Sequence, residues 1–94
     1  MSTYHLRVNI DAVEDVDNLD GSVSKRVAPK IFWLARYASK TKHKALTGGR
    51  WKNKYSKHVA KDWRIVYELD ANSQIVTVIR VAHRSEVYEN PPPS

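Results

Sequence analysis

The residues best suited to chemistry in this sequence are cations gathered between Lys40 and Arg64. This stretch contains a single acid, Asp62, and nine basic residues: Lys40, Lys42, Lys44, Arg50, Lys52, Lys54, Lys57, Lys61 and Arg64. Half of the ten acids, by contrast, fall between Asp11 and Asp20. Clustered cations neutralise phosphates and release counterions, so we expect the stretch to bind a polyanion. A lysine-rich face that is only solvated is the alternative.

Three side chains give this surface possible chemistry. His58 is the best candidate for a general base, because an unperturbed imidazole has a pKa of about 6.5. Arg64 can hold a phosphate through two parallel hydrogen bonds. Tyr88 offers a ring on which an unpaired base can stack. These side chains could therefore act on a bound polyanion, although His58 could equally be structural and Tyr88 could pack the last strand against the helices.

The composition indicates one small domain. The chain has 94 residues, a formal charge of +6 and no cysteine, so we expect a single domain over residues 1–89 and a disordered proline-rich tail at 90–94. Without cysteine there is no disulfide and no thiolate metal site, and His5 and His43 lack carboxylates at ligand spacing. No apolar run is long enough for a membrane span or a signal peptide. We expect a cytoplasmic protein that needs no metal.

The first half of the chain predicts a strand followed by two helices. Apolar and polar residues alternate over 4–10, which favours a strand. Asp11 is expected to cap a helix of about ten residues that Asp20-Gly21 ends. A second helix is expected from Ser22 to about residue 38, with Pro29 kinking it or delaying its start. Phe32 is assigned to the core, and Trp33 is left open.

The second half predicts three strands. Residues 39–49 read as a polar turn, and strands are expected over 51–59, 63–69 and 75–83, joined by short turns that favour an antiparallel meander. The predicted class is α+β, in the order β-α-α-β-β-β, with two N-terminal helices packed on a small, mainly antiparallel sheet.

Strand alternation then sorts the cations by face. In the strand from residue 63, Arg64 points away from the apolar side, and Lys52, Lys54 and His58 of the preceding strand are expected to join it. Lys57 should point the other way. In the last strand, residues 80, 82 and 84 share a face, which brings Arg84 near the same surface.

Two segments of the sequence carry a family resemblance. Asp62-Trp63-Arg64-Ile65-Val66-Tyr67-Glu68 and His83-Arg84-Ser85-Glu86-Val87-Tyr88 are separated by a short turn and a β-branched strand. Together they resemble the C-terminal half of the RelE/ParE superfamily of toxins from type II toxin–antitoxin systems. The resemblance extends to residues 46–51 and Tyr55 and covers nearly the whole domain.

The resemblance implies two activities from different classes. RelE-type members are ribosome-dependent endoribonucleases that cut mRNA in the A site, whereas ParE-type members bind DNA gyrase. A non-catalytic module that binds its antitoxin or nucleic acid is a third possibility. Gyrase binding gives no reason to concentrate cations, whereas RNA phosphates do. The sequence therefore favours an mRNA interferase.

The resemblance also assigns roles to residues. Cleavage without a metal uses the ribose 2′-hydroxyl as nucleophile and needs a base, a group that stabilises the phosphorane, and an acid. The catalytic set it implies is Arg64, Arg84, Tyr88, His58 and Lys54, and the RNA-binding set is Lys52, Lys57, Lys61, Arg50 and Lys44. In some members the arginine before the tyrosine lies two residues further away, where this chain has Ala82. The implied partners are an antitoxin that covers the basic face, mRNA and the ribosome, with no small-molecule cofactor.

Overall fold

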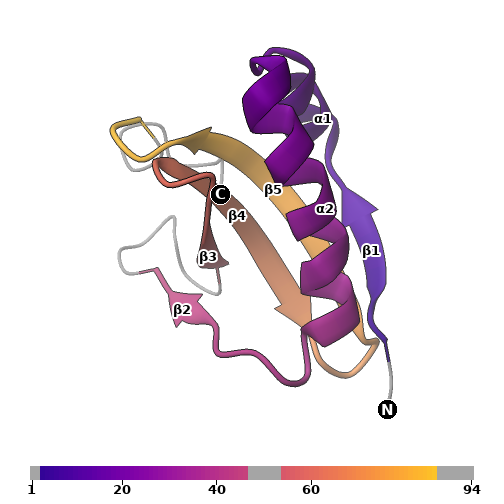
Figure 1. Cartoon of the computed structure of the whole chain (residues 1–94). Coiled ribbons are helices and arrows are strands. Elements are labelled where there is room, and N and C mark those ends of the chain that lie inside the picture. The colour runs from indigo at the N-terminus through magenta and orange to yellow at the C-terminus, as the bar shows by residue number, and fades with distance from the viewer. Residues whose placement is uncertain (1–2, 47–53, 87–94) are drawn as a thin grey trace.

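Two helices cover one face of a five-stranded sheet in the computed structural model, which describes residues 3–46 and 54–86 (Figure 1). The elements are β1 (His5–Val8), α1 (Ile10–Asp17), α2 (Gly21–Tyr37), β2 (Lys44–Ala45), β3 (Lys54–Val59), β4 (Trp63–Asp70) and β5 (Ile75–His83). The sheet order is β1-β5-β4-β3-β2, and only β1 pairs in parallel, with β5. The α+β class and the mainly antiparallel sheet are confirmed. The predicted boundary at residue 89 and the tail at 90–94 lie outside the described residues.

The core forms between α2 and the face of the sheet that it crosses. Val27, Ile31 and Leu34 recur at helical spacing and are buried, as is the Ile65 and Tyr67 face of β4. Burying this stripe stabilises the helix more than its intrinsic propensity does. In the described segments, no helix is long and apolar enough to cross a membrane.

The helix boundaries differ from the prediction at three positions. Asn9, not Asp11, is the N-cap residue of α1, and Ile10 belongs to this helix rather than to the first strand. Asp20 precedes α2 as its N-cap instead of ending α1. Pro29 lies inside an uninterrupted helix. A proline there costs about 3 kcal/mol, which the buried stripe of α2 offsets.

The prediction that Phe32 lies in the core is wrong. Its side chain is 67% exposed, because at about 100° per residue it is turned away from the stripe that begins at Val27 and continues through Ile31. Phe32 instead borders an apolar groove with Leu6 and Val13. Trp33, partly buried, packs against the core.

A short strand that the sequence did not predict, β2, lies beside β3. Lys44 pairs with Ser56 and Ala45 with Tyr55. Within the described ranges, no strand pairs with the outer edge of β3 from Lys57 to Val59. Among the described residues, this stretch of β3 therefore has no neighbouring strand, and it is called the free edge of β3 below.

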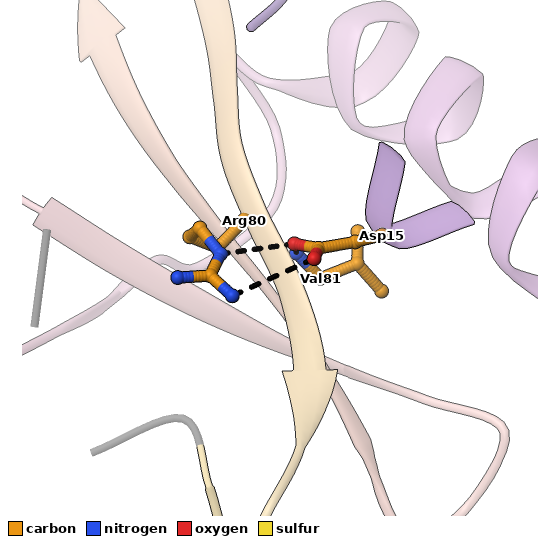
Figure 2. A network of polar contacts seen from close by, with 3 residues as sticks. All are labelled: Asp15, Arg80 and Val81. Carbon is orange, nitrogen blue, oxygen red and sulfur yellow. Dashed lines mark hydrogen bonds and ion pairs between the residues drawn. The ribbon is translucent and has the colours of Figure 1, made fainter. Parts of the chain in front are cut away.

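At the opposite side of the sheet, Asp15 of α1 completes the edge of β5. The pairing with β1 ends at Val78, and beyond it the Asp15 Oδ2 atom accepts hydrogen bonds from the Val81 amide at 2.9 Å and from Arg80 Nε at 3.0 Å (Figure 2). The second carboxylate oxygen accepts from Arg80 Nη2 at 3.5 Å. These bonds raise the pKa of Arg80, against the opposing effect of partial burial. A single carboxylate thus ties α1 to β5 where the sheet loses its neighbouring strand.

Candidate functional site

The candidate site lies on the face of the sheet that the helices do not cover, here called the distal face. Tyr55, Val59, Ile65 and Tyr67 pack on the helix side, so alternation turns the intervening residues the other way. The distal face carries Lys44, Lys54, Ser56, His58, Arg64, Val66 and Glu68. The predicted gathering of Lys54, His58 and Arg64 on one face is confirmed.

His58 and Arg64 lie directly opposite one another on β3 and β4. Residues in this position have Cβ atoms about 5 Å apart, so both side chains can reach one phosphate. Arg64 donates from Nη1 to the Trp63 carbonyl at 3.0 Å, and His58 is exposed. Among the described residues, no carboxylate forms a salt bridge with either side chain.

The surroundings of His58 favour its neutral form. Partial desolvation lowers the pKa of its imidazole, and the positive charges of Arg64, Lys44 and Lys57 lower it further. A neutral imidazole can accept a proton near pH 7. The cations that attract a polyanion therefore also prepare a base.

Lys54 lies at a distance from this pair. It forms a 2.8 Å ion pair with Glu68, and four residues along β3 separate it from His58, about 13 Å at the rise of a strand. Lys44 is closer to the pair, since it affects the pKa of His58. The structure brings Lys44, but not Lys54, together with the pair.

Arg84 lies at one end of the distal face, beside the turn between β3 and β4. Its backbone amide donates to the Asp62 carbonyl at 2.8 Å, and its Nε lies 3.5 Å from Asp62 Oδ1. Lys61 is exposed in the same turn. Three other predicted site residues, Arg50, Lys52 and Tyr88, lie outside the described residues.

Lys57 points to the helix side, as alternation predicted, and is therefore separated from the distal face. Its ammonium group donates to Thr41 Oγ1 at 3.2 Å and to the Lys42 carbonyl at 3.0 Å. The strand does not bulge at this position, because its register with β4 is continuous.

Two histidines belong to the structure rather than to the site. His43 Nε2 lies 2.7 Å from the Ala38 carbonyl, to which it must donate, so its Nδ1 accepts from the Tyr67 hydroxyl at 2.6 Å. His83 faces away from Arg84, with its ring 5.4 Å from that of Trp63. Over residues 3–46 and 54–86, no group of three histidine or acidic side chains could hold a metal ion.

Comparison with known proteins places these features in a family. A family model described as the ParE toxin of the type II toxin–antitoxin system parDE matches residues 7–88. No curated protein matches the chain significantly.

Solved structures share the fold. The RelBE2 toxin–antitoxin complex of Mycobacterium tuberculosis contains a chain with a TM-score of 0.77 and 24% identity, over 90% of this chain and 95% of that chain. A double-arginine mutant of the free Escherichia coli toxin RelE matches with a TM-score of 0.72 and 22% identity, over 96% of this chain and 95% of that chain. A YoeB/ParE toxin from Agrobacterium tumefaciens matches with a TM-score of 0.67 and 18% identity, over 84% of this chain and 96% of that chain.

Proposed function

This chain belongs to the ParE toxin family of type II toxin–antitoxin systems, and on that premise we propose that it is a ribosome-dependent endoribonuclease that cleaves mRNA in the cytoplasm without a metal. The observation that supports this most is the cross-strand pair of His58 and Arg64. A base whose pKa is lowered and a guanidinium that no carboxylate of the described residues engages stand side by side on a cationic face.

The two side chains divide the work of phosphodiester cleavage. The imidazole of His58 takes the proton of a ribose 2′-hydroxyl as the bond from that oxygen to phosphorus forms. Arg64 stabilises the negative charge that develops on the phosphorane. The bond from phosphorus to the 5′-oxygen then breaks, and the leaving oxygen takes a proton from water, which reaches this exposed face. Lys44 and Arg84 contribute positive charge that attracts the RNA.

We include an antitoxin partner in this proposal. The Mycobacterium tuberculosis relative was solved as a toxin–antitoxin complex, and Escherichia coli RelE was solved with an antitoxin peptide. An antitoxin segment that covers the distal face would block access to His58 and Arg64 together.

The decisive experiment compares the wild type with Arg64→Ala in an in vitro translation reaction, with mRNA cleavage mapped by primer extension. Removal of a group that stabilises the transition state typically lowers the rate by about 10²–10³-fold. Arg7→Ala is the matched control, because Arg7 is exposed on β1 at the far edge of the sheet. The Arg7→Ala variant should cleave mRNA as the wild type does.

A second candidate, inhibition of DNA gyrase, is favoured by the ParE description of the family and by the ion pairs that engage Lys54 and Arg84. Supercoiling by gyrase is therefore assayed in parallel. If the mRNA stays intact and supercoiling is inhibited, the protein is a gyrase inhibitor and not a nuclease.

The pH profile tests the role of His58. Because the pKa of His58 is lowered, cleavage should persist below the ordinary imidazole pKa of about 6.5 and decline only at more acidic pH. Lys44→Gln removes one of the positive charges that lower the pKa of His58, so the acidic decline of the cleavage rate should move to higher pH. His58→Gln should slow cleavage and flatten the profile, and an unchanged profile would exclude His58 as the base.

A further inference from the structure

A hollow of about 390 Å³ lies between α2 and the end of β3, and it meets the distal face at His58. One stripe of α2, with Arg26, Pro29, Lys30 and Trp33 spaced three and four residues apart, forms one wall. Val59, Ala60 and the neighbouring His58 form the other. Nothing in the proposed cleavage mechanism uses the α2 wall.

This hollow combines the Trp33 ring with two cations, Arg26 and Lys30, and a third cation, Lys57, lies near the same ring. The Lys30 ammonium lies 3.7 Å from the centroid of the Trp33 ring, and the Lys57 ammonium lies 5.5 Å from the same ring. No acid among the described residues lines the hollow, and no salt bridge between them engages Arg26, Lys30 or Lys57. Within residues 3–46 and 54–86, the positive charge of the site is thus uncompensated.

Lys30, which lines the hollow, repels the nearby Lys57. Burial lowers the pKa of Lys57, and the nearby charge of Lys30 lowers it further. An anion bound beside the Lys30 ammonium would relieve this repulsion, because it would bring an opposite charge to that group at short range.

The free edge of β3 connects this hollow to the distal face. Since β2 pairs only with Tyr55 and Ser56, the edge from Lys57 to Val59 is not covered by a described strand. His58 belongs to both surfaces, because it borders the hollow and pairs with Arg64. A flexible strand of RNA bound at the pair could therefore cross the edge within one or two nucleotides.

We infer that the hollow binds one nucleotide of single-stranded RNA, with the phosphate held by Arg26 and Lys30 and the base stacked on Trp33. Base stacking on an aromatic ring combined with cations along the backbone is the usual physical basis of single-strand binding. When the base stacks on Trp33, the Lys30 ammonium moves from the Trp33 ring to the phosphate. The choice of RNA as ligand rests on the proposed function, whereas the site itself rests on the hollow.

The test measures binding of a fluorescent oligouridylate of about 12 nucleotides by anisotropy, in protein carrying Arg64→Ala so that the RNA stays intact. Trp33→Leu should weaken binding about tenfold, the loss typical of one stacked base. Lys30→Gln should weaken binding and reduce the slope of log K against log salt by about 0.7, the value for one lost phosphate contact. Since the readout is binding, it holds whether or not the wild type cleaves mRNA.

Matched controls come from the same helix. Lys25→Gln removes an exposed charge outside the hollow, and Phe32→Leu removes an exposed ring one residue from Trp33; neither should change affinity or slope. If Trp33→Leu does not fold, an abasic strand of equal length provides the same comparison, and it should bind more weakly than the oligouridylate. Equal effects of Lys25→Gln and Lys30→Gln, or equal affinity for the abasic strand, would overturn the inference.

Discussion

Asp15→Ala should be among the most damaging single substitutions outside the hydrophobic core. The carboxylate accepts hydrogen bonds from a guanidinium and from the amide of Val81, a residue that is only 2% exposed. Hydrogen bonds to charged groups contribute about 1.5–3 kcal/mol, and a buried amide left without a partner costs about 1–3 kcal/mol. The side chains of Asp15 and Arg80 are 20% and 33% exposed, so water partly replaces the lost contacts. We therefore expect a total loss of about 3 kcal/mol, below the sum of the two terms.

The assay is thermal and urea unfolding followed by circular dichroism. For a domain of this size, 1 kcal/mol corresponds to roughly 4–8 °C in Tm, so Asp15→Ala should lower Tm by about 12–24 °C. Asp15→Asn keeps an oxygen for the Val81 amide and Arg80 Nε, but it loses the charge and replaces the acceptor of Arg80 Nη2 by an NH2 group, so it should cost about 1–2 kcal/mol, less than Asp15→Ala. The control is Glu14→Ala, an exposed neighbour on the same helix, with an expected change under about 0.5 kcal/mol. Equal effects of Asp15→Ala and Glu14→Ala would refute the reasoning.

Three further predictions concern stability and use the same unfolding measurements. His43→Phe should lower the free energy of unfolding by about 2 kcal/mol because it leaves the Tyr67 hydroxyl buried without its acceptor. Adding Tyr67→Phe should recover part of this loss. No recovery would contradict the assigned hydrogen bond. Leu34→Ala should cost about 2–5 kcal/mol, whereas Phe32→Ala should cost under about 0.5 kcal/mol, since only the first is buried; similar costs would contradict the exposure of Phe32. Ala60→Gly should raise the free energy of unfolding by about 0.5–1 kcal/mol, because Ala60 has a φ of 47°, a backbone conformation that glycine adopts with less strain. A lower free energy of unfolding would show that the turn is unstrained.

The sequence predicted the residues of the distal face well because strand alternation depends only on neighbouring residues. Alternation with a period of two decides which side chains share a face, and it placed His58 with Arg64 and turned Lys57 away. It also placed β4 and β5 within about one residue of their observed bounds. The pair itself needs the register between two strands, which the short turn at residues 60–62 sets.

Other features depend on contacts that no local pattern encodes. Residues 44–45 have no alternating pattern, and their strand exists only because the edge of β3 is available to pair with them. The bond between Asp15 and Arg80 joins residues 65 positions apart. Phe32 was assigned to the core because it was taken to widen the apolar stripe of α2, whereas its angle around the helix turns it away from that stripe and leaves it exposed.

The run of cations from Lys40 to Arg64 shows why the sequence could not define the whole surface that we propose to bind RNA. By composition the run is a single cluster, yet the sheet divides it between two faces, with Lys44 and Arg64 on one and Lys57 on the other. On the second face the further cations, Arg26 and Lys30, come from α2, which composition had assigned to packing. Because His58 borders both the hollow and the distal face, RNA that engages both in the proposed complex bends around the edge of β3. A single strand can make that bend and a stiff duplex cannot, so the division of the charges itself favours an unpaired substrate.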